Sequence, residues 1–217
     1  MIVFQLFSGC TARAWSILLL LGVSTAVAEL APAPASDGLE LAPEPQRLAA
    51  YAGRWERKPD ASAEADRLAS IDAATLDLSW IMRKMATGLL RRTTTPPDGL
   101  DFFWDGETLH QGTEAAHVGP SRAIRFEVEP RRRVAANGEE TLTRWQWTAS
   151  ELRVSWQQSQ ARGSNTYRLT PDGQALLTEH RIQITALESV APIVYRAWFR
   201  RAPPPAPAPG SIRETGD

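Results

Sequence analysis

Residues 143–156 read TRWQWTASELRVSW, and in both halves of this stretch large apolar residues alternate with polar ones. The alternating residues are Trp145 and Trp147, then, after a short gap, Leu152, Val154 and Trp156. Side chains of a strand point alternately to the two faces of a sheet, so a period of two predicts two strands, each with one buried face. Alternating strands that are joined by tight turns form an antiparallel meander.

The same period recurs along most of the chain. It includes Phe102 and Trp104; Ile124, Phe126 and Val128; Tyr167 and Leu169; Leu176, Thr178, His180, Ile182 and Ile184; and Ile193, Tyr195, Ala197 and Phe199. Turn signals separate these runs at Asp105-Gly106, Asn137-Gly138 and Pro171-Asp172-Gly173. With one more strand at Trp55, we predict a mainly β (α+β) fold, an antiparallel meander of about eight strands that forms a barrel or half-barrel.

An amphipathic helix precedes the meander. Apolar residues recur at helical spacing at Leu68, Ile71, Leu78, Met82, Met85 and Leu89. We expect a helix over 62–92, capped by Asp60, broken near residues 70–72 and stopped by Pro96-Pro97. These apolar residues form a stripe along one side of the helix, which predicts that the helix packs against the sheet. The alternative is a membrane-surface helix, whose polar face should be richer in cations.

The N-terminus has the pattern of a secretory signal peptide. An apolar run from Trp15 to Val23 follows Arg13 and ends at Ala26-Val27-Ala28. We predict a Sec-type signal peptide over 1–28 and a mature chain that begins near Glu29. An uncleaved anchor is the alternative, but the run is shorter than the ~20 apolar residues of a membrane span. We therefore expect no transmembrane span in the mature chain.

Pro-rich segments flank a single domain. Residues 29–47 and 202–217 are rich in Pro and Ala and predict disordered tethers, which leaves 48–201 as one folded unit. The cations are almost all Arg, as in proteins of GC-rich bacteria. Together with the leader, this composition predicts a periplasmic or secreted bacterial protein.

Composition excludes several classes of function. Cys10 is the only cysteine and lies in the leader, so we expect no disulfide and no thiol chemistry in the mature chain. Lys and Arg number 24 against 25 Asp and Glu, a balance that argues against nucleic-acid binding. Arg131-Arg132-Arg133 is the one basic run of three, and we expect it in a solvated loop.

Both ends of the domain resemble those of lipocalins. Gly53-Arg54-Trp55 opens the domain and Arg200-Arg201 closes it. In the lipocalin pattern the Trp closes the base of the barrel and the Arg packs over it, which implies structural roles for Gly53, Trp55 and one of the two arginines. A helix held against a curved sheet is also similar to periplasmic lipoprotein carriers of the LolA type. The helix between Trp55 and the first hairpin departs from lipocalins, whose helix follows the barrel.

The sequence contains no recognisable catalytic set, and we expect no cofactor. His110, Glu114 and His117 are the nearest approach to a metal site, because helical spacing would place them on one face. Gly112 and Gly119-Pro120 instead favour an exposed loop.

The strand pattern places His180 on the apolar face of its strand. A buried imidazole needs a partner, which is either a core neighbour such as Thr178 or Tyr195, or a ligand held in a cavity. The Trp residues likewise either fill a packed core or line an apolar pocket. The candidate ligand-lining residues are Trp104, Phe126, Trp145, Trp147, Trp156, Tyr167, His180 and Tyr195.

These observations predict an exported, non-enzymatic protein that binds or carries a small hydrophobic ligand or lipid in the bacterial envelope. The alternative is an envelope scaffold or protein-interaction module with a fully packed barrel, whose partner is another envelope protein. A metal-dependent hydrolase that uses His110, Glu114 and His117 is a third hypothesis.

Overall fold

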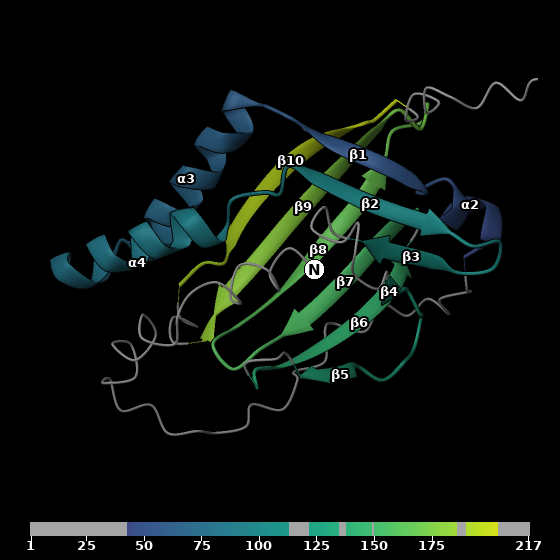
Figure 1. The fold of residues 1–217 in the computed structure, drawn as a ribbon. Helices are drawn as coiled ribbons and strands as arrows, with labels where there is room; N and C mark the ends of the chain where they lie inside the picture. Colours follow the sequence, from purple (N-terminus) through teal and green to yellow (C-terminus); the bar gives the residue numbers. More distant parts are fainter. Residues whose placement is uncertain (1–42, 113–121, 135–137, 149, 186–189, 204–217) are drawn as a thin grey trace, which may run out of the picture.

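The computed structural model describes residues 43–112, 122–134, 138–148, 150–185 and 190–203. These residues form a ten-stranded antiparallel sheet that curls into a half-barrel, with helices at its two ends (Figure 1). The predicted mainly β class and the half-barrel are therefore confirmed. The predicted leader, most of the two tethers, Glu114 and His117 lie outside the described residues.

The strands follow one another around the sheet in nearly the order of the chain. They are β1 (Gly53–Lys58), β2 (Gly99–Trp104), β3 (Leu109–Gly112), β4 (Arg122–Ala123), β5 (Arg131–Val134), β6 (Glu140–Thr148), β7 (Glu151–Gln157), β8 (Ala161–Leu169), β9 (Ala175–Ile184) and β10 (Ile193–Arg201). The spatial order is β4-β3-β2-β1-β10-β9-β8-β7-β6-β5. The first strand joins the two halves of the sheet, because Trp55 lies opposite Leu100 on β2 and opposite Arg201 on β10.

Two details of the predicted strands are wrong. Arg131–Val134 forms β5, paired with β6, where a solvated loop was expected, although Arg131 and Arg132 do remain exposed. Charged side chains suit a strand at the end of a sheet, because they discourage pairing with another chain. Conversely, β4 ends at Ala123, so Phe126 and Val128 lie outside any strand despite their alternation.

Three helices accompany the sheet in the described residues: α2 (Pro45–Ala49), α3 (Ala61–Thr75) and α4 (Trp80–Thr93). The Asp60 carboxylate accepts hydrogen bonds from the backbone nitrogens of Ser62 at 2.9 Å and Ala63 at 3.2 Å, so the predicted cap is confirmed. The single helix predicted over 62–92 is instead two helices, broken at residues 76–79 rather than 70–72. No helix in this part of the chain is long and apolar enough to cross a membrane.

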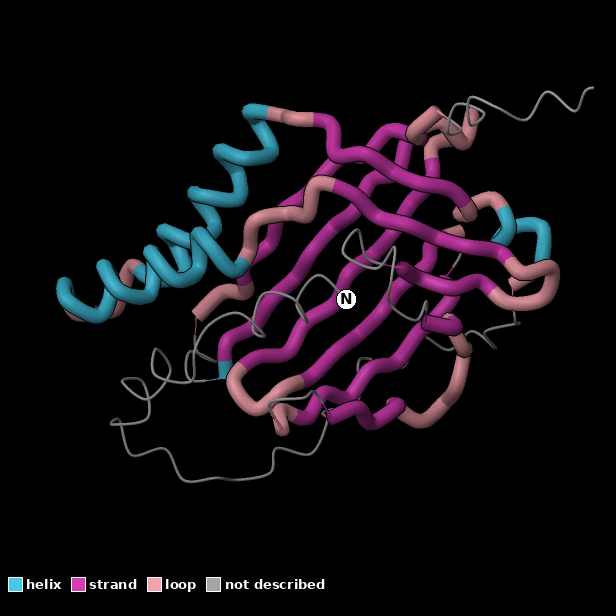
Figure 2. The backbone as a smooth tube through the Cα atoms, viewed as in Figure 1, coloured by secondary structure: helices cyan, strands magenta, loops and turns pink. Residues whose placement is uncertain are grey.

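The helical pair α3 and α4 projects from one end of the half-barrel (Figure 2). α3 lies on β10, where the backbone nitrogen of Val194 donates to Ser70 Oγ at 2.9 Å, and α4 packs on α3. Ile71 is buried as the stripe predicted, but Met85 on α4 is exposed. The turn at residues 76–79 separates the two halves of the stripe, so only the first half faces the sheet.

Two apolar clusters fill the inside of the half-barrel. The base cluster, near α2, includes Tyr51, Trp55, Phe102, Tyr167, Leu176 and Phe199. The helix-side cluster, below α3, includes Ile71, Ala74, Trp156, Ile182, Ile193 and Tyr195. Burial of large aromatic and aliphatic side chains supplies most of the stabilisation that the fold needs in the absence of disulfides.

Candidate functional site

A band of polar side chains separates the two apolar clusters. Along the inner side of β9, Leu176 belongs to the base cluster and Ile182 to the helix-side cluster, whereas Thr178 and His180 lie between them. On the neighbouring strand, Asn165 lies directly opposite His180. We call this band the polar belt; its members, all buried, are Gln111, Asn165, Tyr167, Thr178 and His180.

His180 is held on three sides. Its Nδ1 lies 2.9 Å from Asn165 Oδ1, and its Nε2 lies 3.1 Å from the Thr178 hydroxyl. The Tyr195 ring stacks on the imidazole with 4.6 Å between centroids. Because the amide oxygen only accepts, the ring proton is on Nδ1. Burial lowers the pKa of His180 to about 3, so the imidazole is neutral at physiological pH.

The polar belt continues across the interior to β3. Gln111 Nε2 donates to the Tyr167 hydroxyl at 3.2 Å, whereas Asn165 Nδ2 is buried without a hydrogen-bond partner among the described residues. Burial raises the pKa of Tyr167, although the hydrogen bond from Gln111 opposes the shift. The belt therefore contains two hydrogen-bonded groups, Gln111 with Tyr167 and His180 with Asn165 and Thr178, and such groups hold the side chains of a core in a single arrangement.

Several of the predicted lining residues meet in the base cluster. Trp145 stacks on Tyr167 with 6.0 Å between ring centroids, and Trp147 meets Tyr51 edge-on at 6.1 Å. Trp104 and Phe126 are partly buried against the same cluster. The sequence therefore identified residues that do come together on the inner face, and their contact with a ligand stays a prediction.

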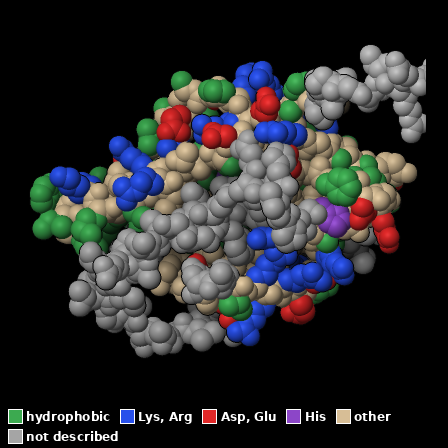
Figure 3. Space-filling view, in the orientation of Figure 1, with side chains coloured by type: hydrophobic (Ala, Val, Ile, Leu, Met, Phe, Trp, Pro, Cys, Tyr) green, Lys and Arg blue, Asp and Glu red, His purple; other side chains and the backbone are tan. Residues whose placement is uncertain are grey.

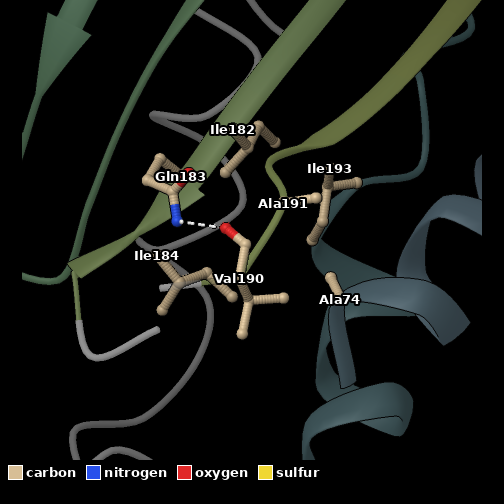
Figure 4. Close-up of a pocket in the computed structure, with 7 residues that line it drawn as sticks. All are labelled: Ala74, Ile182, Gln183, Ile184, Val190, Ala191 and Ile193. Carbon is tan, nitrogen blue, oxygen red and sulfur yellow. Dashed lines mark hydrogen bonds between the residues drawn. The ribbon is translucent and has the colours of Figure 1, made fainter. Parts of the chain in front are cut away.

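The helix-side cluster holds the remaining predicted aromatic residues, Trp156 and Tyr195. The Trp156 indole nitrogen is buried without a hydrogen-bond partner among the described residues. A small apolar pocket of about 160 Å³, part of it open to solvent, lies in this cluster (Figure 4). Its lining residues are Ala74, Ile182, Gln183, Ile184, Val190, Ala191 and Ile193, with Gln183 Nε2 donating to the Val190 carbonyl at 3.2 Å.

Two arginines lie on the inner side of the strands at the two ends of the sheet. Arg122 on β4 is opposite the buried Gln111, and Arg133 on β5 is opposite the buried Thr141. Directly opposed residues share a face, so both arginines belong to the inner face. Burial, followed by repulsion from Arg133, lowers the pKa of Arg122, so the two guanidinium groups are within electrostatic range. Two cationic groups therefore lie near each other on the inner face.

The metal hypothesis finds no support among the described residues. His110 lies in strand β3 rather than in the expected loop, and its Nε2 is 2.7 Å from Asp105 Oδ2. No group of three His, Cys, Asp or Glu side chains that could hold a metal ion occurs in these parts of the chain. Glu114 and His117 lie outside them, so the proposed triad is not tested.

Sequence reasoning missed two members of the polar belt, Asn165 and Gln111. Asn165 lies two residues before Tyr167 on β8, so the period of two places its side chain on the same inner face as those of Tyr167 and Leu169. Gln111 offered no such signal, because β3 is only four residues long.

No family model matches the chain, and no curated protein matches its sequence. Solved structures do resemble it. A secretory abundant heat soluble protein from Ramazzottius varieornatus is 12% identical over 70% of this chain and 96% of that chain, with a TM-score of 0.43. Lipid binding protein 8 from Caenorhabditis elegans is 17% identical over 71% and 96%, with a TM-score of 0.42.

A fatty acid binding protein from Schistosoma mansoni, solved with arachidonic acid, is 13% identical over 72% of this chain and 99% of that chain, with a TM-score of 0.42. The curled antiparallel sheet of the present chain is consistent with the lipocalin-like resemblance predicted from its two ends. What those proteins bind is a property of those proteins.

Proposed function

We propose that this protein binds or carries a small hydrophobic ligand on the inner face of its half-barrel. The polar belt between two apolar clusters is the observation that carries the proposal. An amphipathic molecule fits this arrangement, because its apolar body packs against aromatic rings while one polar group bonds within the belt. The unpartnered indole nitrogen of Trp156 is a donor that such a polar group would satisfy.

The two neighbouring cations Arg122 and Arg133 on the inner face favour a ligand with an anionic group. Repulsion from Arg133 contributes to the lowered pKa of the half-buried Arg122, and a carboxylate or phosphate beside the two guanidinium groups would offset that repulsion. We therefore propose an anionic amphiphile, such as a long-chain fatty acid, as the ligand class.

We further propose that the protein acts outside the cytoplasm of a bacterium, in the periplasm or beyond. The apolar run from Trp15 to Val23, followed by Ala26-Val27-Ala28, supports this location. The test is N-terminal sequencing of the protein purified from cells. A chain that begins near Glu29 supports export, and one that retains Met1 contradicts it.

Native mass spectrometry of the protein purified from its own envelope tests the ligand directly. A bound apolar molecule that survives purification is expected. The purified protein is then titrated with a fluorescent fatty acid, together with W156F, which keeps an aromatic ring but removes the N–H. W198F is the matched control, since Trp198 lies on the outer side of β10.

If the Trp156 N–H bonds the ligand, W156F should bind about tenfold more weakly, whereas W198F should bind like the parent. A protein that carries no molecule from cells and takes up none from lipid extracts contradicts the proposal.

A packed scaffold is the second candidate function. The complete burial of Trp55, Tyr167 and Phe199, and the small size of the pocket beside Ala74, favour it. In that case cross-linking in cells should trap an envelope protein, and the fluorescent fatty acid should not bind.

A further inference from the structure

The tip of the helical pair exposes a group of large apolar side chains. Leu76 is 60% exposed, Trp80 75%, Ile81 61% and Met85 42%. They gather where α3 turns into α4, at the left-hand end of the molecule in the space-filling view (Figure 3). Four neighbouring exposed apolar residues cost solubility, so a surface that keeps them usually has something to contact.

The charge of α4 is entirely positive. It contains Arg83, Lys84, Arg91 and Arg92 and no Asp or Glu. The acids of the helical pair lie elsewhere: Glu64, Asp66 and Asp72 on α3, and Asp77 in the turn. Asp72 pairs with Arg91 at 3.4 Å in an exposed ion pair, which is weak in water. The cations that a membrane-surface helix requires are thus concentrated on the second helix.

The apolar and cationic residues of α4 share its outer side. At roughly 100° per residue, Trp80, Ile81, Lys84, Met85 and Arg92 fall within an arc of about 140°. Leu90 and Thr93 lie on the opposite side and are buried. The Lys84 ammonium is 5.9 Å from the centroid of the Trp80 ring, so apolar and charged groups are interleaved on one surface.

We propose that the outer side of α4 docks on a lipid surface that carries anionic headgroups. Trp is favoured at the boundary between headgroups and acyl chains, and Ile81 and Met85 would enter the apolar layer beside it. Lys84 and Arg92 would contact the anionic headgroups, each adding attraction that salt screens. The tip projects outward, a shape that suits insertion into a lipid layer better than a contact with a flat protein surface. This proposal does not depend on the ligand proposed above.

Vesicle co-sedimentation tests the proposal with the protein as purified from cells. Vesicles of phosphatidylcholine containing phosphatidylglycerol are compared with vesicles of phosphatidylcholine alone, at low and high salt. The variants are the pair W80A/I81A and the pair K84Q/R92Q. F103A is the matched apolar control and R200Q the matched charge control, since both residues are exposed far from α4. The parent and all variants begin at the same residue. Differences in their vesicle binding are therefore due to the substitutions.

The protein should bind the anionic vesicles at least tenfold more tightly than the neutral ones, and high salt should weaken binding. Each α4 pair should lose roughly tenfold or more in affinity, whereas both controls should bind like the parent. Circular dichroism and thermal unfolding check that all variants remain folded. Absence of binding, or equal binding by all variants, overturns the proposal. Self-association that W80A/I81A abolishes, without vesicle binding, would assign the surface to a second copy of the chain.

Discussion

The guanidinium of Arg201 lies over the indole ring of Trp55, 4.3 Å from its centroid. It also donates to the carbonyls of Ala50 at 2.8 Å and Gly173 at 3.1 Å, and to that of Ala52. The last strand thus closes the base over the first, as the lipocalin-like pattern implied, and Arg201 rather than Arg200 is the residue that does so.

Loss of this closure should destabilise the fold. We expect R201A to lower the free energy of unfolding by about 2–4 kcal/mol, because three carbonyl contacts and a cation–π contact disappear together. R200A is the control: Arg200 forms an exposed pair with Glu56 at 3.2 Å, so its loss should cost at most about 1 kcal/mol. Urea unfolding of both variants measures the difference. Equal effects would contradict the assigned role of Arg201.

Gly163 should tolerate no side chain. A Cβ at this position would lie 2.2 Å from the Arg181 carbonyl oxygen and 2.7 Å from a ring carbon of Trp156. We expect G163A to cost about 2–4 kcal/mol, because neither the β9 backbone nor the buried ring can move away cheaply. G88A should instead stabilise by about 0.5–1 kcal/mol, since nothing lies within 4 Å and Gly88 is inside α4. Thermal unfolding compares the two substitutions, and a harmless G163A would contradict the packing described.

His180 should make stability fall in acid. Its pKa is about 3 in the folded protein and 6.5 in the unfolded chain, so below pH 6.5 only the unfolded state gains the proton. The loss should reach roughly 2 kcal/mol at pH 5 and continue to about pH 3. H180Q lacks this dependence, so its free energy of unfolding should fall less than that of the parent between pH 7 and pH 5. Parallel pH profiles would contradict the burial of a neutral imidazole.

The hydrogen bonds of His180 should make replacement of this residue by Leu destabilising. We expect H180L to cost about 1–3 kcal/mol, because the Asn165 amide oxygen is left buried without its partner, although Thr178 can still donate to the Ala197 carbonyl at 3.3 Å. Urea unfolding measures this cost, and a variant as stable as the parent would contradict it.

The charge of the ligand should affect its affinity if the ligand contacts Arg122 and Arg133. A fluorescent fatty acid should bind roughly tenfold more tightly than its methyl ester, and R133Q should reduce that preference. R168Q is the control, since Arg168 on β8 pairs with Glu151 in an exposed contact. Binding that is indifferent to the carboxylate would remove Arg133 from the site.

Strand periodicity predicted the central strands well because they are long and each buries one face, as in β9 from Leu176 to Ile182. It failed where strands are short or charged: β4 has two residues, and β5 is mostly Arg. The break between α3 and α4 was misplaced because Ser70 and Asp72 are poor helix formers, yet Ser70 is retained there by its bond to Val194. The bounds of these elements depend on the strands that lie beside them, and the pairing of strands cannot be read from a single sequence.

The candidate site was predictable to the same extent. The alternation of apolar and polar residues in three long strands placed Tyr167, His180 and Tyr195 on the inner face. Their presence on that face could therefore be predicted from the sequence. The ring stacking of His180 on Tyr195, and its bond to Asn165, depend on the register between strands. The exposed tip of α4 could not be predicted, because the apolar residues keep their helical spacing across the turn between α3 and α4.

The pairing of β1 with β10 has a consequence for the order of events during folding. Trp55 and Arg201 are aligned in register although the whole meander lies between them along the chain. Bringing such distant segments together carries a large entropic cost of loop closure, and contacts of this kind slow folding. A nascent chain emerging N-terminus first holds Trp55 without its cover until its last strand is synthesised. A chain truncated before β10 should therefore remain open and prone to proteolysis.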